Sequence, residues 1–178
     1  MIKILFVCHG NICRSPMAEF VMKKIAKDNN MENMFHIESC ATSTEEIGNP
    51  VYPPARKILA EHGINCNGKS ARQMTFGDYQ NFDYIIAMDY NNLRNISRFV
   101  KYDTENKIHL LMSYTGKERS VSDPWYTRDF QSAWNDINEG CNALFLHILK
   151  EQHLGCLYPH FLFKILTKKF FCDRIYKI

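Results

Sequence analysis

The sequence lacks the marks of a secreted or zinc-binding chain. Its first apolar run, residues 2–7, is too short for a secretory signal and leads straight into a polar loop. The seven cysteines include no pair separated by two residues and show no zinc-ligand spacing. Internal repeats and low-complexity linkers are also missing. These absences direct attention to individual reactive side chains rather than to disulfides, metals or repeats.

What the sequence does contain is a cysteine and an arginine placed across a short loop. Residues 2–7 have the apolar, β-branched character of a buried parallel strand, and Cys8 and Arg14 follow with five residues between them. Pro16 suits the first turn of a helix. A loop between a strand and a helix N-terminus is a natural anion site, because unpaired N–H groups and partial positive charge converge there.

The residue types in this loop indicate nucleophilic chemistry on a phosphate. Loop amides and the helix end favour a Cys8 thiolate, and Arg14 offers a planar fork for two phosphoryl oxygens. Gly10 lets amides turn inward, Asn11 tolerates a left-handed backbone, and Ser15 can donate a hydrogen bond to the Cys8 sulfur. Such a thiol favours the reducing cytoplasm as its location. The alternative is a buried cysteine beside an exposed arginine.

A second cluster consists of Asp123, Pro124, Trp125 and Tyr126, just before a helix with apolar periodicity. Cleavage of a phosphate ester expels an alkoxide or phenoxide, and Asp123 on a loop is a candidate general acid for that leaving group. Trp125 and Tyr126 could form a wall beside an aromatic substrate. The alternative for Asp123 is a helix cap or a turn aspartate.

The remaining pattern alternates strands and helices over one domain. Strands are expected at residues 2–7, 35–39, 83–88 and 108–112, and helices after the first loop, at 52–62, near 91–98 and at 127–153. Gly63 provides a stop for the second of these helices. This alternation predicts an α/β fold, a four-stranded parallel sheet with helices on both faces. Ligands of such sheets bind at the carboxyl ends of the strands, where Cys8 lies.

The loop VCHGNICRSPMAE, residues 7–19, resembles the signature loop of the low-molecular-weight protein tyrosine phosphatases, which have a flavodoxin-like fold. The segment DPWY, residues 123–126, resembles their general-acid loop. Further segments between the two are also similar, namely residues 39–43, 48–50, 71–73 and 82–89. The resemblance covers about residues 2–152 and is closest to the bacterial branch.

The resemblance implies hydrolysis of phosphotyrosine and small aryl phosphates through a phosphocysteine, without a metal or organic cofactor. In it Cys8 is the nucleophile, Arg14 binds the phosphoryl oxygens, and Asp123 protonates the leaving group and then activates water. Asn11, Ser15 and Ser39 support the loop. Substrate contacts are expected from His9, Gly10, Asn11, Ile12, Cys13, Ser15, Trp125 and Tyr126, with no catalytic role for His9 on the loop rim.

The resemblance also implies that Cys8 and Cys13 form a redox pair. This sequence departs from the family pattern at two positions. In this family a cysteine at the position of Cys13 can form a reversible disulfide with the oxidised Cys8. Glu45, next to Glu46, stands where animal members often have an aromatic residue on the pocket wall, and both are expected to form a solvated acidic rim. Lys69 stands where relatives often carry histidine.

The last segment differs from the rest in composition, and the domain is expected to comprise residues 1–153. Residues 154–178 hold five of the 22 Lys and Arg residues and one of the 19 Asp and Glu residues, so residues 1–153 carry a net charge of −1 and the whole chain +3. The domain therefore has no excess of basic residues for nucleic acid. The extension is interrupted by Pro159 and Lys164 and does not read as a bilayer span. It is either a dispensable extension or a membrane-surface contact.

The expected partners are phosphotyrosine proteins, with a tyrosine kinase among the candidates.

Three other functions compete with phosphotyrosine hydrolysis. Arsenate reduction uses the same loop but needs resolving cysteines, and residues 67–140 contain none. Phosphoarginine phosphatases tend to carry threonine where this chain has Ile12. A non-catalytic phosphate-binding module would not need Cys8, Arg14 and Asp123 together. No oligomeric state is predicted.

Overall fold

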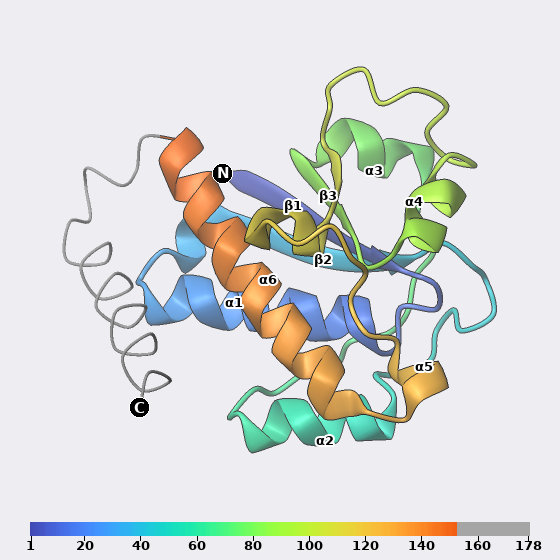
Figure 1. The fold of residues 1–178 in the computed structure, drawn as a ribbon, viewed down its shortest axis with the longest axis vertical. Coiled ribbons are helices and arrows are strands. Elements are labelled where there is room, and N and C mark those ends of the chain that lie inside the picture. The colour runs from blue at the N-terminus through green and yellow to red at the C-terminus, as the bar shows by residue number, and fades with distance from the viewer. Residues whose placement is uncertain (153–178) are drawn as a thin grey trace. The chain divides into compact units, whose positions relative to one another are not determined.

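The computed structural model describes residues 1–152, so the predictions for residues 154–178 lie outside the described residues. Within the described part, no helix is long and apolar enough to cross a bilayer. The elements, shown in Figure 1, are β1 (Ile2–Cys8), α1 (Arg14–Asp28), the 3₁₀ helix η1 (Glu32–Met34), β2 (Phe35–Ala41), α2 (Pro53–Glu61), α3 (Phe76–Asn81), β3 (Tyr84–Ala87), α4 (Tyr90–Ile96), β4 (Ile108–Leu110), the 3₁₀ helix η2 (Leu111–Thr115), α5 (Pro124–Thr127) and α6 (Phe130–Glu151).

The four strands form one parallel sheet in the order β2-β1-β3-β4, which confirms the predicted fold class. The chain leaves β1 toward β2 on one side and later returns to β3 on the other. The register sets Cys8 opposite Ala41 of β2, and Val7 opposite Ala87 of β3. The loops after these three strands therefore meet at one edge of the sheet, beside the point where the strand order reverses. That place is the usual ligand site of a doubly wound sheet.

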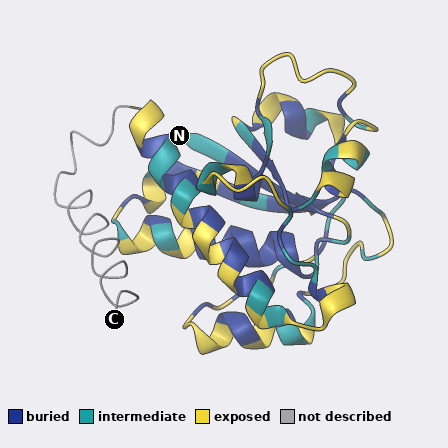
Figure 2. Ribbon diagram, viewed as in Figure 1, coloured by how far each residue is buried: buried dark blue, intermediate teal, exposed yellow. Residues whose placement is uncertain are grey.

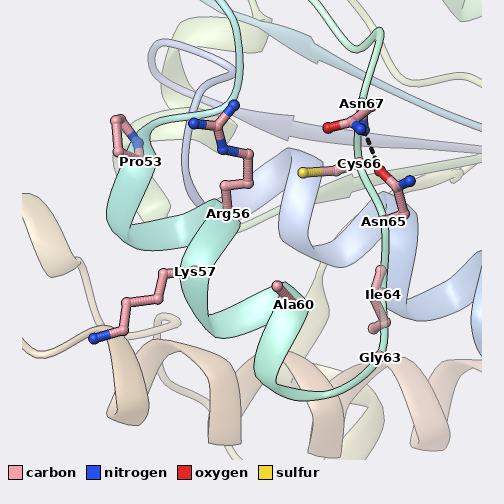
Figure 3. A pocket seen from close by; sticks show the side chains of 9 residues that line it. All are labelled: Pro53, Arg56, Lys57, Ala60, Gly63, Ile64, Asn65, Cys66 and Asn67. Carbon is pink, nitrogen blue, oxygen red and sulfur yellow. Dashed lines mark hydrogen bonds between the residues drawn. The ribbon is translucent and has the colours of Figure 1, made fainter.

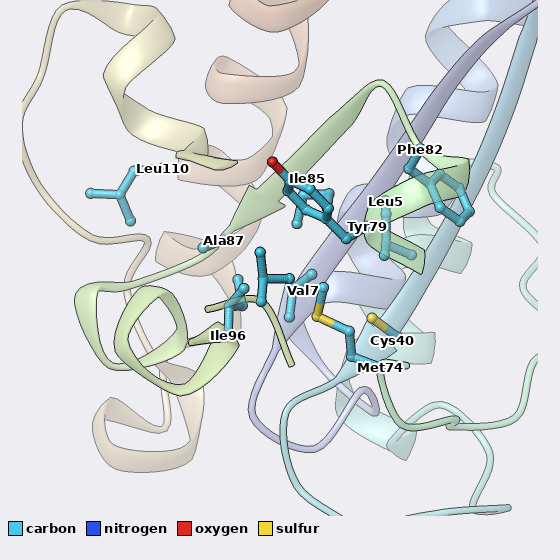
Figure 4. Packing of buried hydrophobic residues seen from close by; sticks show 11 residues of the cluster. Leu5, Val7, Cys40, Met74, Tyr79, Phe82, Ile85, Ala87, Ile96 and Leu110 are labelled. Carbon is cyan, nitrogen blue, oxygen red and sulfur yellow. The ribbon is translucent and has the colours of Figure 1, made fainter. Parts of the chain in front are cut away.

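The central strand β1 is buried on both faces, which explains its unbroken apolar run. Leu5 and Val7 belong to a cluster on the α3 and α4 side, and Ile4 and Phe6 are fully buried as well. Figure 4 shows this cluster, and Figure 2 shows the buried strands between partly exposed helices. Eleven buried residues make up the cluster: Leu5, Val7, Cys40, Met74, Tyr79, Phe82, Ile85, Ala87, Ile96, Val100 and Leu110.

Several element ends differ from the sequence expectations for local reasons. The predicted helix 127–153 begins only at Phe130, as α6, because Arg128 adopts a left-handed backbone (φ 60°) after α5, a short helix that was not expected. The predicted strand 108–112 stops at Leu110, where η2 begins. The six-residue helix α3 was not expected, because it is too short to show periodicity. Its signal is the capping box that Thr75 forms with Asp78.

Gly140 of α6 provides a test of the packing between this part of α6 and η2. A Cβ atom at Gly140 would lie 2.5 Å from Cγ of Leu111, closer than any real contact. We expect Gly140→Ala to lower the free energy of unfolding by about 1–3 kcal/mol through overpacking. Gly77→Ala is the control, because a Cβ there would meet no atom closer than 3.7 Å. Urea unfolding of both variants measures the difference; equal stabilities would contradict the close packing.

Candidate active site

The loop after β1 wraps its backbone around the end of that strand. Asn11 has a left-handed backbone with a φ of 58°, as expected for this position. Gly10 has an ordinary backbone, but a Cβ there would lie 3.1 Å from Cγ of Glu46. Glycine at this position is therefore explained by the close approach of the neighbouring loop. The helix α1 begins at Arg14, so the arginine and Ser15 are its first residues and Pro16 lies in its first turn.

Cys8 is the last residue of β1, is 3% exposed, and is approached by two hydrogen-bond donors. The Ser15 hydroxyl lies 3.0 Å from the Cys8 sulfur, and the backbone N–H of Asn11 donates to that sulfur at 3.3 Å. Both donors can stabilise a thiolate, and the N-terminus of α1 adds partial positive charge. The sulfur is thus prepared to carry a negative charge in a nearly dry site.

A chain of hydrogen bonds positions the Ser15 hydroxyl beside Cys8. The Asn11 side-chain oxygen accepts from the backbone N–H of Arg72 at 3.2 Å, which orients the amide. Its Nδ2 then donates to the hydroxyls of Ser15 and Ser39, both at 2.8 Å. While the Ser15 oxygen accepts this bond, its own proton can go to the Cys8 sulfur at 3.0 Å or to the more distant Cys40 carbonyl at 3.4 Å.

The chain ends on a buried carboxylate. The Ser39 hydroxyl donates to Glu19 at 2.6 Å, and Lys69 forms an ion pair with the same carboxylate at 2.8 Å. Burial alone would raise the pKa of Glu19, but the charge of Lys69 and hydrogen bonds from Lys23, Lys69 and Ser39 lower it overall. The sequence marked Lys69 only as a departure from relatives. In the structure the Lys69 ammonium pairs with the Glu19 carboxylate, which accepts the hydrogen bond from Ser39 at the end of this chain.

Arg14 is held between two carboxylates. Its NH1 bonds Asp89 at 2.7 Å and its NH2 pairs with Asp123 at 2.6 Å. Burial alone would lower the pKa of Arg14, but the charges of Cys8, Asp123 and Asp89 outweigh it and raise that pKa. Asp89 was not among the predicted site residues. Its only sequence signal is its place after a strand and before a helix, where it caps α4 by accepting from the backbone N–H of Asn92.

Asp123 caps a helix and also contacts the reactive loop. Its side chain accepts from the backbone N–H of Trp125 at 3.0 Å, so the cap alternative describes its local structure correctly. The same carboxylate reaches Arg14, which a simple cap would not require. Trp125 and Tyr126 are 51% and 83% exposed, and Trp125 lies edge-on to Tyr52. The two aromatic side chains thus stand at the entrance, where a flat substrate can pack.

These groups open into one pocket of about 260 Å³. Its lining comes from four parts of the chain. These are the loop from Cys8 to Arg14 except Asn11, the pair Glu45 and Glu46, the α4 residues Asn91, Asn92 and Asn95, and the segment with Asp123, Trp125 and Tyr126. At the rim His9 lies 2.9 Å from Glu45 and is half exposed. Glu46 accepts from Asn49 at 2.6 Å. The acidic rim is therefore partly paired rather than fully solvated.

Cys13 lies on the same loop as Cys8 and is also free and buried. Burial, followed by the charge of Cys8, raises the pKa of Cys13 to about 12. Cys13 is therefore a thiol at neutral pH, and Cys8 is the thiol of the pair that has donors directed at its sulfur. Burial likewise raises the pKa of Cys40 and Cys141, so neither is a competing nucleophile.

A larger hollow of about 570 Å³ lies beside α2 and the turn after it (Figure 3). Arg56 and Lys57 stand on one side, and Cys66 on the other. Burial raises the pKa of Cys66. Because this hollow holds neither an activated thiol nor a carboxylate, it offers no chemistry comparable to that of the Cys8 pocket.

Comparison with known proteins gives consistent matches. Residues 3–154 match the family model of the low molecular weight phosphotyrosine protein phosphatases. The low molecular weight phosphotyrosine protein phosphatase of Gallus gallus is 43% identical over 145 residues, which are 79% of this chain and 91% of that protein.

Solved structures agree with these matches. The crystal structure of YfkJ from Bacillus subtilis superposes with a TM-score of 0.82 at 37% identity, covering 85% of this chain and 96% of that one. The Drosophila arginine phosphatase structure gives a TM-score of 0.76 at 31% identity, covering 83% and 98%.

The buried pair of Lys69 and Glu19 provides a stability test. We expect Lys69→Met to lower the free energy of unfolding by roughly 3 kcal/mol, because it removes the buried cation from a buried carboxylate and leaves only the half-exposed Lys23. A group with a lowered pKa stabilises the fold above its ordinary pKa, and this contribution is lost on acidification. The deficit of the variant should therefore shrink below about pH 4.

Lys57→Met is the matched control. Lys57 is exposed and lies 4.0 Å from Glu61, and such surface pairs contribute ~0–1 kcal/mol. Urea unfolding at pH 7 and about pH 3 compares the two variants with the parent chain. Equal, pH-independent effects of both substitutions would show that the Lys69–Glu19 pair contributes no more to stability than a surface ion pair.

Proposed function

The chain belongs to the low-molecular-weight phosphotyrosine protein phosphatase family, and we propose that its pocket hydrolyses phosphotyrosine through a phosphocysteine intermediate on Cys8. The observation that carries this proposal is the convergence of three groups. The Cys8 sulfur has two donors directed at it, and Arg14 touches Asp123 beside it. Nucleophile, phosphate ligand and proton donor thus share one pocket.

In the first step the Cys8 thiolate attacks phosphorus as the bond to the phenolic oxygen breaks. The loop amides and the Arg14 guanidinium stabilise the charge on the three phosphoryl oxygens. The incoming phosphate takes over the side of the Arg14 guanidinium that pairs with Asp123 in the structure. Asp123 in its protonated form then donates its proton to the departing phenolate.

In the second step water replaces the sulfur. Asp123, now a carboxylate, accepts a proton from the attacking water, and the P–S bond breaks with its electron pair on Cys8. The Ser15 hydroxyl and the Asn11 N–H stabilise the returning thiolate. The network from Asn11 to Glu19 serves both steps, because it keeps these donors aimed at sulfur.

The remaining parts of the proposal concern the setting of the enzyme. Phosphotyrosine proteins are the proposed substrates, with a tyrosine kinase among the candidates, and the cytoplasm is the proposed location. Cys13 is proposed to capture an oxidised Cys8 as a disulfide, which shields the nucleophile from further oxidation. We place the catalytic domain at residues 1–153.

Phosphoarginine is the competing substrate that the structural relatives make relevant. The Drosophila relative is an arginine phosphatase, so the reaction occurs on this fold. In this chain Ile12 lines the pocket, and its side chain offers no hydrogen-bond acceptor to a guanidinium. An apolar wall is better suited to a phenyl ring. A comparison of kcat/KM on phosphotyrosine and phosphoarginine peptides of equal sequence discriminates the two substrates.

Replacement of the nucleophile is the primary test. We expect Cys8→Ser to remove turnover of p-nitrophenyl phosphate while vanadate or phosphate still binds, because Arg14 and the loop amides remain. Isothermal titration measures the binding, and a colorimetric assay measures the turnover. Cys141→Ser is the control, since Cys141 is fully buried in α6 and does not line the pocket. Turnover by the Cys8 variant would end the phosphocysteine proposal.

Asp123 is tested by varying the leaving group. We expect Asp123→Asn to slow hydrolysis of phenyl phosphate far more than that of p-nitrophenyl phosphate, because a basic leaving group depends on general-acid help worth ~10²–10⁴-fold. Asn retains a side-chain oxygen that can cap α5 but has no carboxylic proton to donate. The variant therefore distinguishes a catalytic role of Asp123 from its capping role. An equal loss on both substrates, measured as kcat/KM, would assign Asp123 to structure alone.

A further inference from the structure

The wall of the pocket formed by α4 contains a buried amide oxygen without a hydrogen-bond partner among the described residues. Asn92 is 1% exposed, and its Oδ1 has no partner among residues 1–152. The residue lines the same pocket as Cys8 and Asp123. Buried polar groups in native proteins are nearly always paired with protein or water. The Asn92 amide is therefore expected to pair with a small polar molecule in the working enzyme.

The position of Asn92 is fixed relative to the phosphate-binding arginine. The backbone N–H of Asn92 donates to one oxygen of Asp89 at 2.6 Å, and the other oxygen of Asp89 accepts from Arg14 at 2.7 Å. A single carboxylate thus ties both residues together. Asn91 lines the same pocket but is exposed. Asn92 is accordingly a buried part of the pocket wall, whereas Asn91 is an exposed part of the same wall.

The chemistry of an amide oxygen selects among the molecules that enter the pocket. Phosphoryl oxygens need donors, and Arg14 with the loop amides supplies them. The attacking water has two O–H bonds, of which Asp123 accepts one, so the second needs another acceptor. The terminal torsion of asparagine is soft, which allows Oδ1 of Asn92 to turn toward a water in the pocket. The pocket volume of about 260 Å³ leaves ample room for one water beside a bound phosphoryl group.

We propose that Asn92 positions the water that hydrolyses the phosphocysteine, an inference that rests on the function proposed above. The water oxygen forms a bond to phosphorus as the P–S bond breaks, and its electron pair returns to Cys8. One proton of the water passes to Asp123. The other proton stays on the product phosphate, hydrogen-bonded to Oδ1 of Asn92 during the attack. Asn92 is thus a positioning residue for the second step, without a part in the first.

An alcohol acceptor separates this role from a structural one. Glycerol can replace water in the second step, but its attacking oxygen has a single O–H, which goes to Asp123. Loss of Asn92 should therefore slow attack by water more than attack by glycerol. We expect Asn92→Ala and the similarly sized Asn92→Leu to lower kcat about tenfold. The ratio of glycerol phosphate to inorganic phosphate should rise several-fold, while the pre-steady-state burst of p-nitrophenol keeps its rate.

The matched control is Asn91→Ala, on the same wall and of the same residue type, which should leave the product ratio unchanged. Thermal unfolding checks that each variant is folded. A product ratio at the parent value in both Asn92 variants overturns the proposal, whether kcat is unchanged, the burst slows or KM rises. Absence of a burst and of glycerol phosphate in the parent enzyme would instead contradict the phosphocysteine mechanism itself.

Discussion

One buried cation organises the reactive end of this sheet. Arg14 is 4% exposed and lies between the carboxylates of Asp89 and Asp123. A buried guanidinium is costly unless it is paired, so the two carboxylates must be brought to it. Each of them is also the N-cap of a helix, α4 or α5. The charge of Arg14 therefore fixes where two helices begin, and with them the two walls of the pocket.

The opposite side of the loop is held by neutral hydrogen bonds that end on a second ion pair. Asn11 connects Ser15 to Ser39, and Glu19 with Lys69 closes the chain below them. Since one carboxylate accepts from several donors, loss of any donor affects all the others. The lysine at position 69 supplies the cation of this pair. A histidine there would depend on its protonation for the same effect.

The parts of the molecule that were predictable have strong local signals. The apolar run of β1, the spacing from Cys8 to Arg14 and the resemblance of the DPWY segment located the fold class and the main reactive groups. The break at Arg128 was missed, because a left-handed arginine has no sequence signature comparable to that of glycine. Asp89 and Lys69 were given no place in the site because their roles depend on contacts between residues distant in the chain, 75 positions from Arg14 and 50 from Glu19.

The base and the rim of the pocket obey different physical limits. At the base, groups are buried and paired, so a substitution changes stability and chemistry together. At the rim, His9 and Glu45 form a half-exposed pair, and such pairs contribute ~0–1 kcal/mol to stability. Rim residues can therefore change with little effect on the fold while they alter the charge that an approaching peptide meets. This separation explains how a glutamate can stand where animal relatives often have an aromatic residue, above an intact reactive loop. Selection among phosphotyrosine peptides is thus expected to lie in the residues around the entrance, and the rate of the chemical steps in the buried residues below it.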